Sequence, residues 1–240
     1  MTILVTGVAG FIGSNFVYYY LRKHPERKII GLDNLTYAGN LDNLSGLTEE
    51  EKKRFTFIKG DICDTELVDR IFSENEIDGV INFAAESHVD RSIHDPQIFL
   101  KTNILGTQVL LDAAKNHWRL PDGKWRSLDQ REEGEAIQDR FSRTTPRFLQ
   151  ISTDEVYGSL GPTGFFTEKT PIDPHSPYSA SKASADLIVK AYHDTYGMPM
   201  NITRCSNNYG PYSIIRDRLY YLHWRNLHSF VHAENRESIL

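Results

Sequence analysis

Two adjacent carboxylic acids, Asp154 and Glu155, lie in the segment S-T-D-E-V-Y-G, residues 152–158. Paired acids can supply a proton donor and a proton acceptor within one site. Tyr178 precedes Lys182 by about one helical turn, so the two side chains share a face if this segment is a helix. The ammonium then favours the phenolate and lowers the pKa of Tyr178. These residue types predict removal of a hydroxyl proton coupled to loss of water.

The elements that must position these residues alternate between strands and helices. Short apolar runs bounded by turn residues separate helical patterns, which is the signature of an α/β fold. Because crossovers between parallel strands are right-handed, we expect a doubly wound, Rossmann-like parallel sheet. The last helix has a good N-cap in Ser176 and a typical stop in Gly197. Strands are predicted at 2–6, 28–33, 54–59, 79–83, 147–152 and 200–204, and helices at 11–24, 65–73, 96–117 and 177–196.

The composition limits the class of protein. The chain has 240 residues, 40% of them hydrophobic and 25% charged, which suffices for a large core. The net charge of -5 argues against a nucleic-acid partner. No apolar run reaches the ~18 residues that a membrane-spanning helix needs, and the N-terminus reads as a strand, not a signal peptide. Two distant cysteines, Cys63 and Cys205, have no metal-ligand spacing and fit a reducing cytoplasm.

A glycine-rich turn follows the first predicted strand and opens the first helix. Its pattern is G-x-x-G-x-x-G, with Gly7, Gly10 and Gly13. Such a turn lets the backbone approach a pyrophosphate at the N-terminus of a helix, although a purely structural tight turn gives the same pattern. Asp33 ends the second strand, where a carboxylate accepts hydrogen bonds from an adenosine ribose and repels a 2′-phosphate. The sequence therefore favours NAD over NADP.

Other predicted strand ends carry candidates for the same site. Asp61, after the third strand, either reaches an adenine or is only a turn acid. The segment N-F-A-A-E, residues 82–86, leaves the fourth strand through small residues, as a close ligand or a tightly packed corner would require. Thr153 ends the fifth strand, facing the crevice where open α/β sheets bind ligands. The candidate cofactor contacts are Gly7, Gly10, Phe11, Ile12, Gly13, Asp33, Asn34, Asp61, Ile62, Ala84, Ala85, Tyr178 and Lys182.

Several of these motifs resemble the extended short-chain dehydrogenase/reductase family and, within it, the nucleotide-sugar 4,6-dehydratases. The matching stretches are the glycine turn, L-D-N-L-T-Y-A-G-N (32–40), G-D-I (60–62), F-A-A-E-S-H-V-D-R-S (83–92), S-T-D-E-V-Y-G-S, S-P-Y-S-A-S-K and R-C-S-N-N-Y-G-P-Y (204–212). They cover 1–116 and 147–212. Related epimerases share the tyrosine and lysine but usually lack the D-E pair, so this pair favours a dehydratase.

The resemblance implies a redox-neutral dehydration with NAD retained on the enzyme, dTDP-glucose as substrate and a 4-keto-6-deoxy sugar nucleotide as product. Tyr178, assisted by Thr153, would take the proton of the 4-hydroxyl group. Glu155 would remove the proton at position 5, and Asp154 would protonate the departing 6-hydroxyl group. The catalytic candidates are Thr153, Asp154, Glu155, Tyr178 and Lys182, and the substrate-binding candidates are Glu86, Ser87, Thr153 and Asn207.

The chain departs from the family pattern in three places. Val8 replaces a usual glycine of the turn, and a polar insertion occupies 117–146. The match ends after Tyr212, so we expect an NAD-binding domain over 1–212, an atypical tail at 213–240 and a largely missing substrate subdomain, as in a truncated or frame-shifted relative. The alternatives are a UDP-sugar dehydratase or epimerase, and a catalytically silent NAD-binding module. Family members usually dimerise through two helices, corresponding here to 96–117 and 176–196, so a homodimer is expected.

Overall fold

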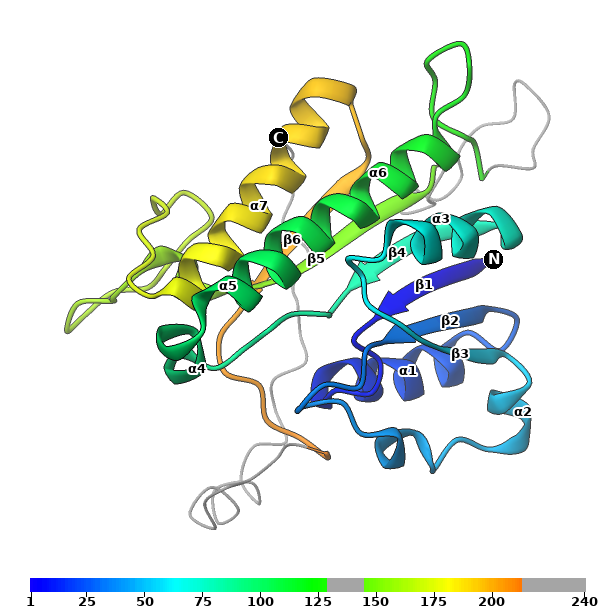
Figure 1. Ribbon diagram of the computed structural model, residues 1–240, viewed down its shortest axis with the longest axis horizontal. Helices are drawn as coiled ribbons and strands as arrows, with labels where there is room; N and C mark the ends of the chain where they lie inside the picture. The colour runs from blue at the N-terminus through cyan, green and yellow to red at the C-terminus, as the bar shows by residue number, and fades with distance from the viewer. Residues whose placement is uncertain (129–144, 213–240) are drawn as a thin grey trace.

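The computed structural model describes residues 1–128 and 145–212. Six parallel strands form one sheet in the order β3-β2-β1-β4-β5-β6 (Figure 1). The strands are β1 (Thr2–Thr6), β2 (Lys28–Asp33), β3 (Phe55–Lys59), β4 (Ile77–Asn82), β5 (Arg147–Thr153) and β6 (Met200–Cys205). The α-helices are α1 (Phe11–Lys23), α2 (Glu49–Lys52), α3 (Thr65–Glu74), α4 (Val89–His94), α5 (Pro96–Phe99), α6 (Thr107–Trp118) and α7 (Pro177–Tyr196). Two 3-10 helices, η1 (Leu41–Leu44) and η3 (Asp154–Tyr157), and a π-helix, η2 (Leu100–Gly106), lie between them.

The strand order places a switch point between β1 and β4. From β1 the chain passes through α1 to β2 and then β3 on one side, and later returns to β4 on the other side of β1. The loops after β1 and β4 therefore run in opposite directions and open a crevice at the carboxyl ends of these strands. The predicted doubly wound, Rossmann-like parallel sheet is confirmed, and every predicted strand is present.

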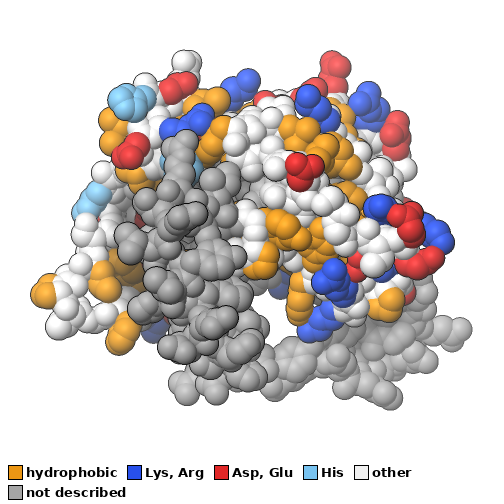
Figure 2. Space-filling model, turned by 90° about the horizontal axis from the view of Figure 1, so that it is seen from below, with side chains coloured by type: hydrophobic (Ala, Val, Ile, Leu, Met, Phe, Trp, Pro, Cys, Tyr) orange, Lys and Arg blue, Asp and Glu red, His pale blue; other side chains and the backbone are white. Residues whose placement is uncertain are grey.

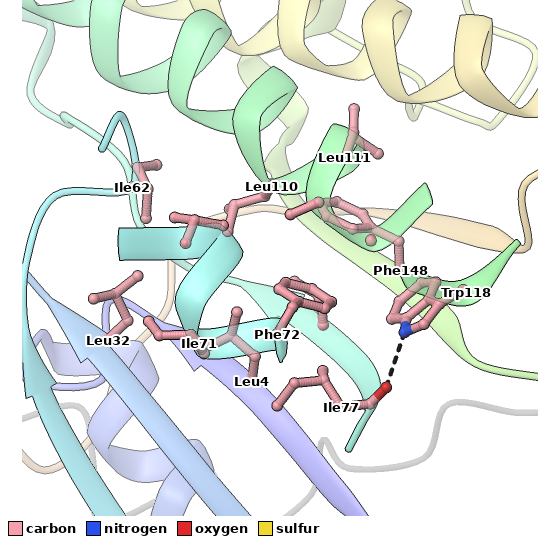
Figure 3. Packing of buried hydrophobic residues seen from close by; sticks show 14 of the residues in the cluster. Leu4, Leu32, Ile62, Ile71, Phe72, Ile77, Leu110, Leu111, Trp118 and Phe148 are labelled. Atoms are coloured by element: carbon pink, nitrogen blue, oxygen red, sulfur yellow. Dashed lines mark hydrogen bonds between the residues drawn. The ribbon is translucent and has the colours of Figure 1, made fainter. Parts of the chain in front are cut away.

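Helices cover both faces of the sheet (Figure 1). Neighbouring residues of β1 point to opposite faces, so Leu4 lies in the core beneath α3 and α6 while Val5 lies in the core beneath α1. The apolar strands are nearly continuous because a parallel sheet is buried on both sides. In the core beneath α3 and α6, the indole Nε1 of Trp118 donates a 2.8 Å hydrogen bond to the carbonyl of Ile77 (Figure 3). This bond fixes the end of α6 to the start of β4.

Helix α7, which carries the tyrosine and the lysine, has the ends that its sequence predicts. Ser176 is the N-cap, and its side chain and that of Ser179 form a reciprocal capping box. Pro177 occupies the first helical position. Gly197 ends the helix in the left-handed conformation at φ 69, which glycine adopts without steric cost. Local turn chemistry therefore places Tyr178 in the first turn of α7.

The structure is helical throughout the range predicted as one helix, 96–117, but the helix is not a regular α-helix. The chain forms α5, then the π-helix η2, then α6. The wider turn of η2 directs Asn103 into the interior, where its side chain contacts the backbone of Glu86 and the hydroxyl of Ser181. The Thr107 hydroxyl donates to the Asn103 carbonyl at 2.8 Å. A π-turn at this point thus connects the helix to the loop after β4 and to α7.

The predicted insertion at 117–146 is described only in part. Helix α6 extends to Trp118, and an isolated antiparallel bridge joins Arg119 to Trp125. Residues 129–144 of the insertion and the predicted tail at 213–240 lie outside the described residues. Within the described ranges, every helix is too short or too polar to cross a bilayer. On the face seen in Figure 2, acidic and basic side chains are interspersed rather than gathered by sign.

Candidate active site

A cleft with a volume of about 440 Å³ opens at the carboxyl edge of the sheet, above the switch point. Its lining comes from the turn after β1, from the ends of β2, β4 and β5, and from α7. A cleft at this edge is where doubly wound sheets bind ligands. Segments far apart in the sequence therefore meet in one cavity.

The glycine turn forms one wall of the cleft. Gly7 has φ 68, and a Cβ there would lie 2.8 Å from the Ala84 nitrogen, so the ends of β1 and β4 meet too closely for any side chain. A Cβ on Gly13 would lie 2.1 Å from the Gly7 carbonyl oxygen. Only glycine at these two positions lets α1 begin against the turn, where Phe11, Ile12 and Gly13 line the cleft. This geometry fits a pyrophosphate.

Two acids, Asp33 and Asp61, line the cleft near the ends of β2 and β3. The carboxylate of Asp33 accepts backbone hydrogen bonds from Ala9 at 2.9 Å and Leu35 at 2.8 Å, which fix its position beside the glycine turn. Asp61 accepts from the backbone of Cys63 at 2.9 Å and from the Asn34 side chain at 3.4 Å. Asp61 is therefore a turn acid that also lines the cleft, so the two sequence interpretations are compatible.

Buried polar groups hold the central strand ends in register. The Thr6 hydroxyl donates to the Asn82 side chain at 2.6 Å and accepts from the backbone of Ala84 at 3.1 Å. The Asn82 amide donates to Gln150 at 2.9 Å and to Thr107 at 3.2 Å. Thr6, Asn82, Thr107 and Gln150 are all buried, and satisfied polar networks of this kind specify one arrangement. The small residues Ala84 and Ala85 thus leave β4 along a fixed path into the cleft.

The loop after β4 presents an unusual carboxylate. Glu86 is 3% exposed, and within the described part of the chain its Oε2 atom has no hydrogen-bond partner. Arg91 approaches that oxygen at 3.8 Å, and its guanidinium lies 3.7 Å from the centroid of the Tyr37 ring. Burial raises the pKa of Glu86, and the Arg91 charge opposes this. The Tyr37 hydroxyl donates to the Ser87 carbonyl at 2.8 Å, so Glu86 and Ser87 are held at the cleft wall.

The two adjacent acids take different positions in η3. Thr153 caps η3 by accepting from the Glu155 backbone at 3.2 Å, and its hydroxyl donates to Asp154 Oδ1 at 3.4 Å. Glu155 lines the cleft but Asp154 does not. Although Glu155 is exposed as a whole residue, partial desolvation raises the pKa of its carboxyl group, and the neighbouring Asp154 charge adds to this. A carboxylate of raised pKa is a stronger base.

Tyr178 and Lys182 both line the cleft, as their spacing on one face of α7 predicts. The Lys182 ammonium is buried and donates to the Ile151 carbonyl at 2.7 Å. Burial and the Glu155 charge raise the pKa of Tyr178 to about 12, while a side-chain hydrogen bond with Thr153 lowers it. The predicted lowering of the Tyr178 pKa is therefore wrong for the protein alone, because burial raises it more than the Thr153 hydrogen bond lowers it.

The cleft brings together all but one of the residues that the sequence singled out. The exception is Asp154. Sequence reasoning missed several lining residues, including His88. The motif that holds His88 also holds Ser87, so its position next to a candidate was the available signal. The additional lining residues are Leu32, Thr36, Ala38, Gly39, Gly60, Phe83, His88, Thr102, Ile151, Ser152, Cys205, Ser206 and Asn208.

Comparison with known proteins agrees with this geometry. The model of the GDP-mannose 4,6 dehydratase family matches residues 4–219. The chain belongs to this family. Its membership confirms the resemblance to nucleotide-sugar 4,6-dehydratases that the motifs indicate. Among residues 1–128 and 145–212, no three His, Cys, Asp or Glu side chains gather as a metal site would require.

Curated and solved members of the family resemble the chain over its described length. A dTDP-glucose 4,6-dehydratase from Xanthomonas campestris pv. campestris (strain B100) is 51% identical over 212 residues, covering 88% of this chain and 54% of the relative. The crystal structure of dTDP-glucose 4,6-dehydratase from Bacillus anthracis str. Ames in complex with NAD has a TM-score of 0.71 at 45% identity, covering 88% of this chain and 56% of that one. That of the Streptomyces venezuelae dTDP-glucose 4,6-dehydratase, with NAD and dTDP bound, has a TM-score of 0.73 at 44% identity, covering 88% and 57%. The chain thus spans about half the length of the relatives it matches.

Proposed function

We propose that the cleft binds NAD. The proposal rests on the glycine turn, where Cβ atoms on Gly7 and Gly13 would collide with backbone, and on the fixed carboxylate of Asp33. A cradle without side chains suits a pyrophosphate, and an acid at the end of β2 suits an unphosphorylated ribose. Two solved relatives, which are 45% and 44% identical to this chain, have NAD bound, and this supports the same cofactor here.

We further propose that the chain catalyses 4,6-dehydration of a dTDP-hexose, dTDP-glucose being the substrate of its relatives. The observation that carries this proposal is the convergence of Thr153, Glu155 and Tyr178 on one cleft beside the glycine turn. Oxidation alone requires only the tyrosine and lysine, whereas elimination of water requires additional acid–base groups. The D-E pair at the end of β5 supplies these groups.

The residues divide the proton transfers between them. NAD, when bound, supplies a hydride acceptor that returns the hydride later and a positive charge that favours the Tyr178 phenolate. Tyr178 accepts the proton of the sugar's 4-hydroxyl group, and its side-chain hydrogen bond with Thr153 favours the phenolate. Glu155, whose raised pKa makes it a stronger base, removes the proton at position 5. Asp154 would donate a proton to the departing 6-hydroxyl group, a role that requires its side chain to turn toward the cleft, which it does not line in this structure.

The sugar would lie against the wall formed by the loop after β4. Glu86 offers a buried carboxylate oxygen that has no hydrogen-bond partner among the described residues and only a 3.8 Å ion pair with Arg91, so it can accept a hydrogen bond from a sugar hydroxyl. Ser87 lies beside it in the chain and also lines the cleft. Asn207 lines the cleft after β6, where its amide can contact the sugar or its phosphates. Removing the partner of a buried polar group is costly, so these groups favour a hydroxylated ligand.

The test is incubation of the full chain with NAD and dTDP-glucose, followed by chromatography of the nucleotides. A 4-keto-6-deoxy product, recognised by its absorbance in alkali, is expected. Tyr178→Phe should form none while keeping its fold. UDP-glucose in a parallel reaction tests the alternative base. If NAD binds but neither nucleotide sugar is converted, the chain is a silent NAD-binding module and the dehydratase proposal is wrong.

We also propose that two copies associate through the helices of the α6–α7 side. Leu100 and Leu105 of η2 and Leu187 of α7 are 47%, 55% and 53% exposed, which is high for leucine and supports a contact there. Light scattering after size-exclusion chromatography tests this, and a monomer at micromolar concentration would refute it. The cytoplasmic location inferred from cysteine usage stays a prediction.

A further inference from the structure

A second ionisable group lies on the catalytic face of α7. Asp186 follows Lys182 by about one turn and Tyr178 by about two, so all three point the same way. Its side chain is 1% exposed. Oδ2 accepts from Arg204 Nε at 2.8 Å and from the Ser152 hydroxyl at 3.0 Å, whereas Oδ1 has no hydrogen-bond partner within the described residues. A carboxylate is thus buried directly behind the catalytic residues.

Arg204 connects this carboxylate to the segment that carries the acids. Arg204 lies near the end of β6. It pairs with Asp186 and donates from Nη1 to the Tyr157 hydroxyl at 2.8 Å. Its guanidinium also lies 5.1 Å from the centroid of the Tyr157 ring. Tyr157 is the last residue of η3, the element containing Glu155. One guanidinium therefore fixes α7, β6 and η3 relative to one another.

The Lys182 ammonium needs a counter-charge because it is almost completely removed from water. A buried cation is costly unless an anion or hydrogen bonds compensate it. Ile151 provides one carbonyl at 2.7 Å but no charge. Burial lowers the pKa of Lys182, and the Asp186 charge acts in the opposite direction. The titratable and charged groups around Lys182 are Tyr178 and Asp186 of α7, Glu155 of η3, and Arg204 and Cys205 of β6.

We infer that Asp186 is a positioning residue for the proposed dehydration: its carboxylate keeps the buried Lys182 ammonium charged, and Arg204 holds that carboxylate in place. The role rests on the proposed function only in that the reaction uses Lys182. Burial raises the pKa of the Asp186 carboxyl group, and the Arg204 guanidinium opposes this rise. The pair therefore acts on Lys182 from behind the cleft, without contacting substrate.

Two variants that break the same ion pair distinguish this role from a purely structural one. NAD affinity and turnover should fall above the pH at which Lys182 loses its proton, and we call this pH the alkaline limit. Asp186→Asn removes the anion and leaves the Arg204 cation behind Lys182, so the alkaline limit should move down by about 1–3 pH units. Arg204→Gln removes the guanidinium that holds the Asp186 carboxylate, so the counter-charge on Lys182 weakens and that limit should also move down, by less than in Asp186→Asn. The double variant should move it no further than Asp186→Asn alone. Asp194→Asn, on the exposed end of α7 in a pair with Lys190, is the matched control and should not shift either profile.

The measurements are NAD affinity by calorimetry from pH 6 to 10 and turnover over the same range, with thermal melts for each variant. A lower alkaline limit in both single variants, with the control unmoved, supports the inference. An unmoved limit in Asp186→Asn, or equal losses at every pH, overturns it. Should Asp186→Asn fail to fold, an unmoved limit in Arg204→Gln would still overturn it. An inactive wild type with shifted NAD profiles would refute the dehydratase but leave the Asp186–Lys182 coupling intact.

Discussion

Gly13 is the position in the glycine turn that leaves least room for a side chain. A Cβ there would lie 2.1 Å from the Gly7 carbonyl oxygen and 2.8 Å from its carbonyl carbon. Carbon–oxygen contacts normally begin at roughly 3.3 Å, so Gly13→Ala must move α1 away from the turn by about 1 Å. Both obstacles are backbone atoms, which cannot swing aside as a side chain can. The strain therefore falls on the place where the N-terminus of α1 meets the cleft.

This displacement should weaken cofactor binding. A misplacement of about 1 Å in a positioning element costs on the order of 100-fold, and we expect a loss of that size in NAD affinity, measured by calorimetry. Gly10→Ala is a graded comparison, because its Cβ would meet only the Gly7 carbonyl oxygen at 3.4 Å. Gly161→Ala is the neutral control, since nothing lies within 4 Å of its Cβ.

The ranking of the three variants is the decisive result. Circular dichroism and a thermal melt establish which variants are folded before affinity is compared. A folded Gly13→Ala protein that binds NAD as tightly as Gly161→Ala would refute the argument that steric exclusion at the turn creates the pyrophosphate site.

Three further predictions concern the acids and the core. Glu155→Gln should reduce turnover by about 10²- to 10⁴-fold with NAD affinity unchanged, as measured by initial rates and calorimetry. Because folding raises the pKa of Glu155 above its usual 4.5, this group stabilises the protein most below that value, and the contribution is lost as pH rises through the folded pKa; Glu155→Gln should therefore raise the melting temperature at pH 7 but not at pH 4. Phe148→Ala, at a fully buried position, should lower the free energy of unfolding in urea by about 3–5 kcal/mol. Phe165→Ala, at 91% exposure, should change it by less than about 0.5 kcal/mol.

Features that depend on local chemistry were predictable. The ends of α7 follow from Ser176, Pro177 and Gly197, which act within a few residues of themselves. The strands follow from apolar runs, because a parallel sheet buries both faces. The glycine turn and Asp33 are recognisable together because one pattern places them at neighbouring strand ends. Short segments of the sequence therefore suffice to predict the fold and most of the residues that line the cleft.

Features that depend on tertiary contacts were not predictable. Helical spacing correctly places Tyr178 and Lys182 on one face, but it does not show that the ammonium reaches the Ile151 carbonyl or that burial controls the tyrosine. The π-turn of η2 is favoured by contacts of Asn103 with residues far along the chain. Likewise, the pairing of Asp186 with β6 leaves no signal in the local sequence.

The most direct test of the central claim is the fate of dTDP-glucose in deuterium oxide with the full chain and NAD. If Glu155 removes the proton at position 5 while water leaves from position 6, the product carries solvent deuterium at position 5, which NMR and mass spectrometry detect. We predict a deuterated 4-keto-6-deoxy product from the wild type and none from Glu155→Gln. Recovery of unlabelled dTDP-glucose from a protein saturated with NAD would contradict the account.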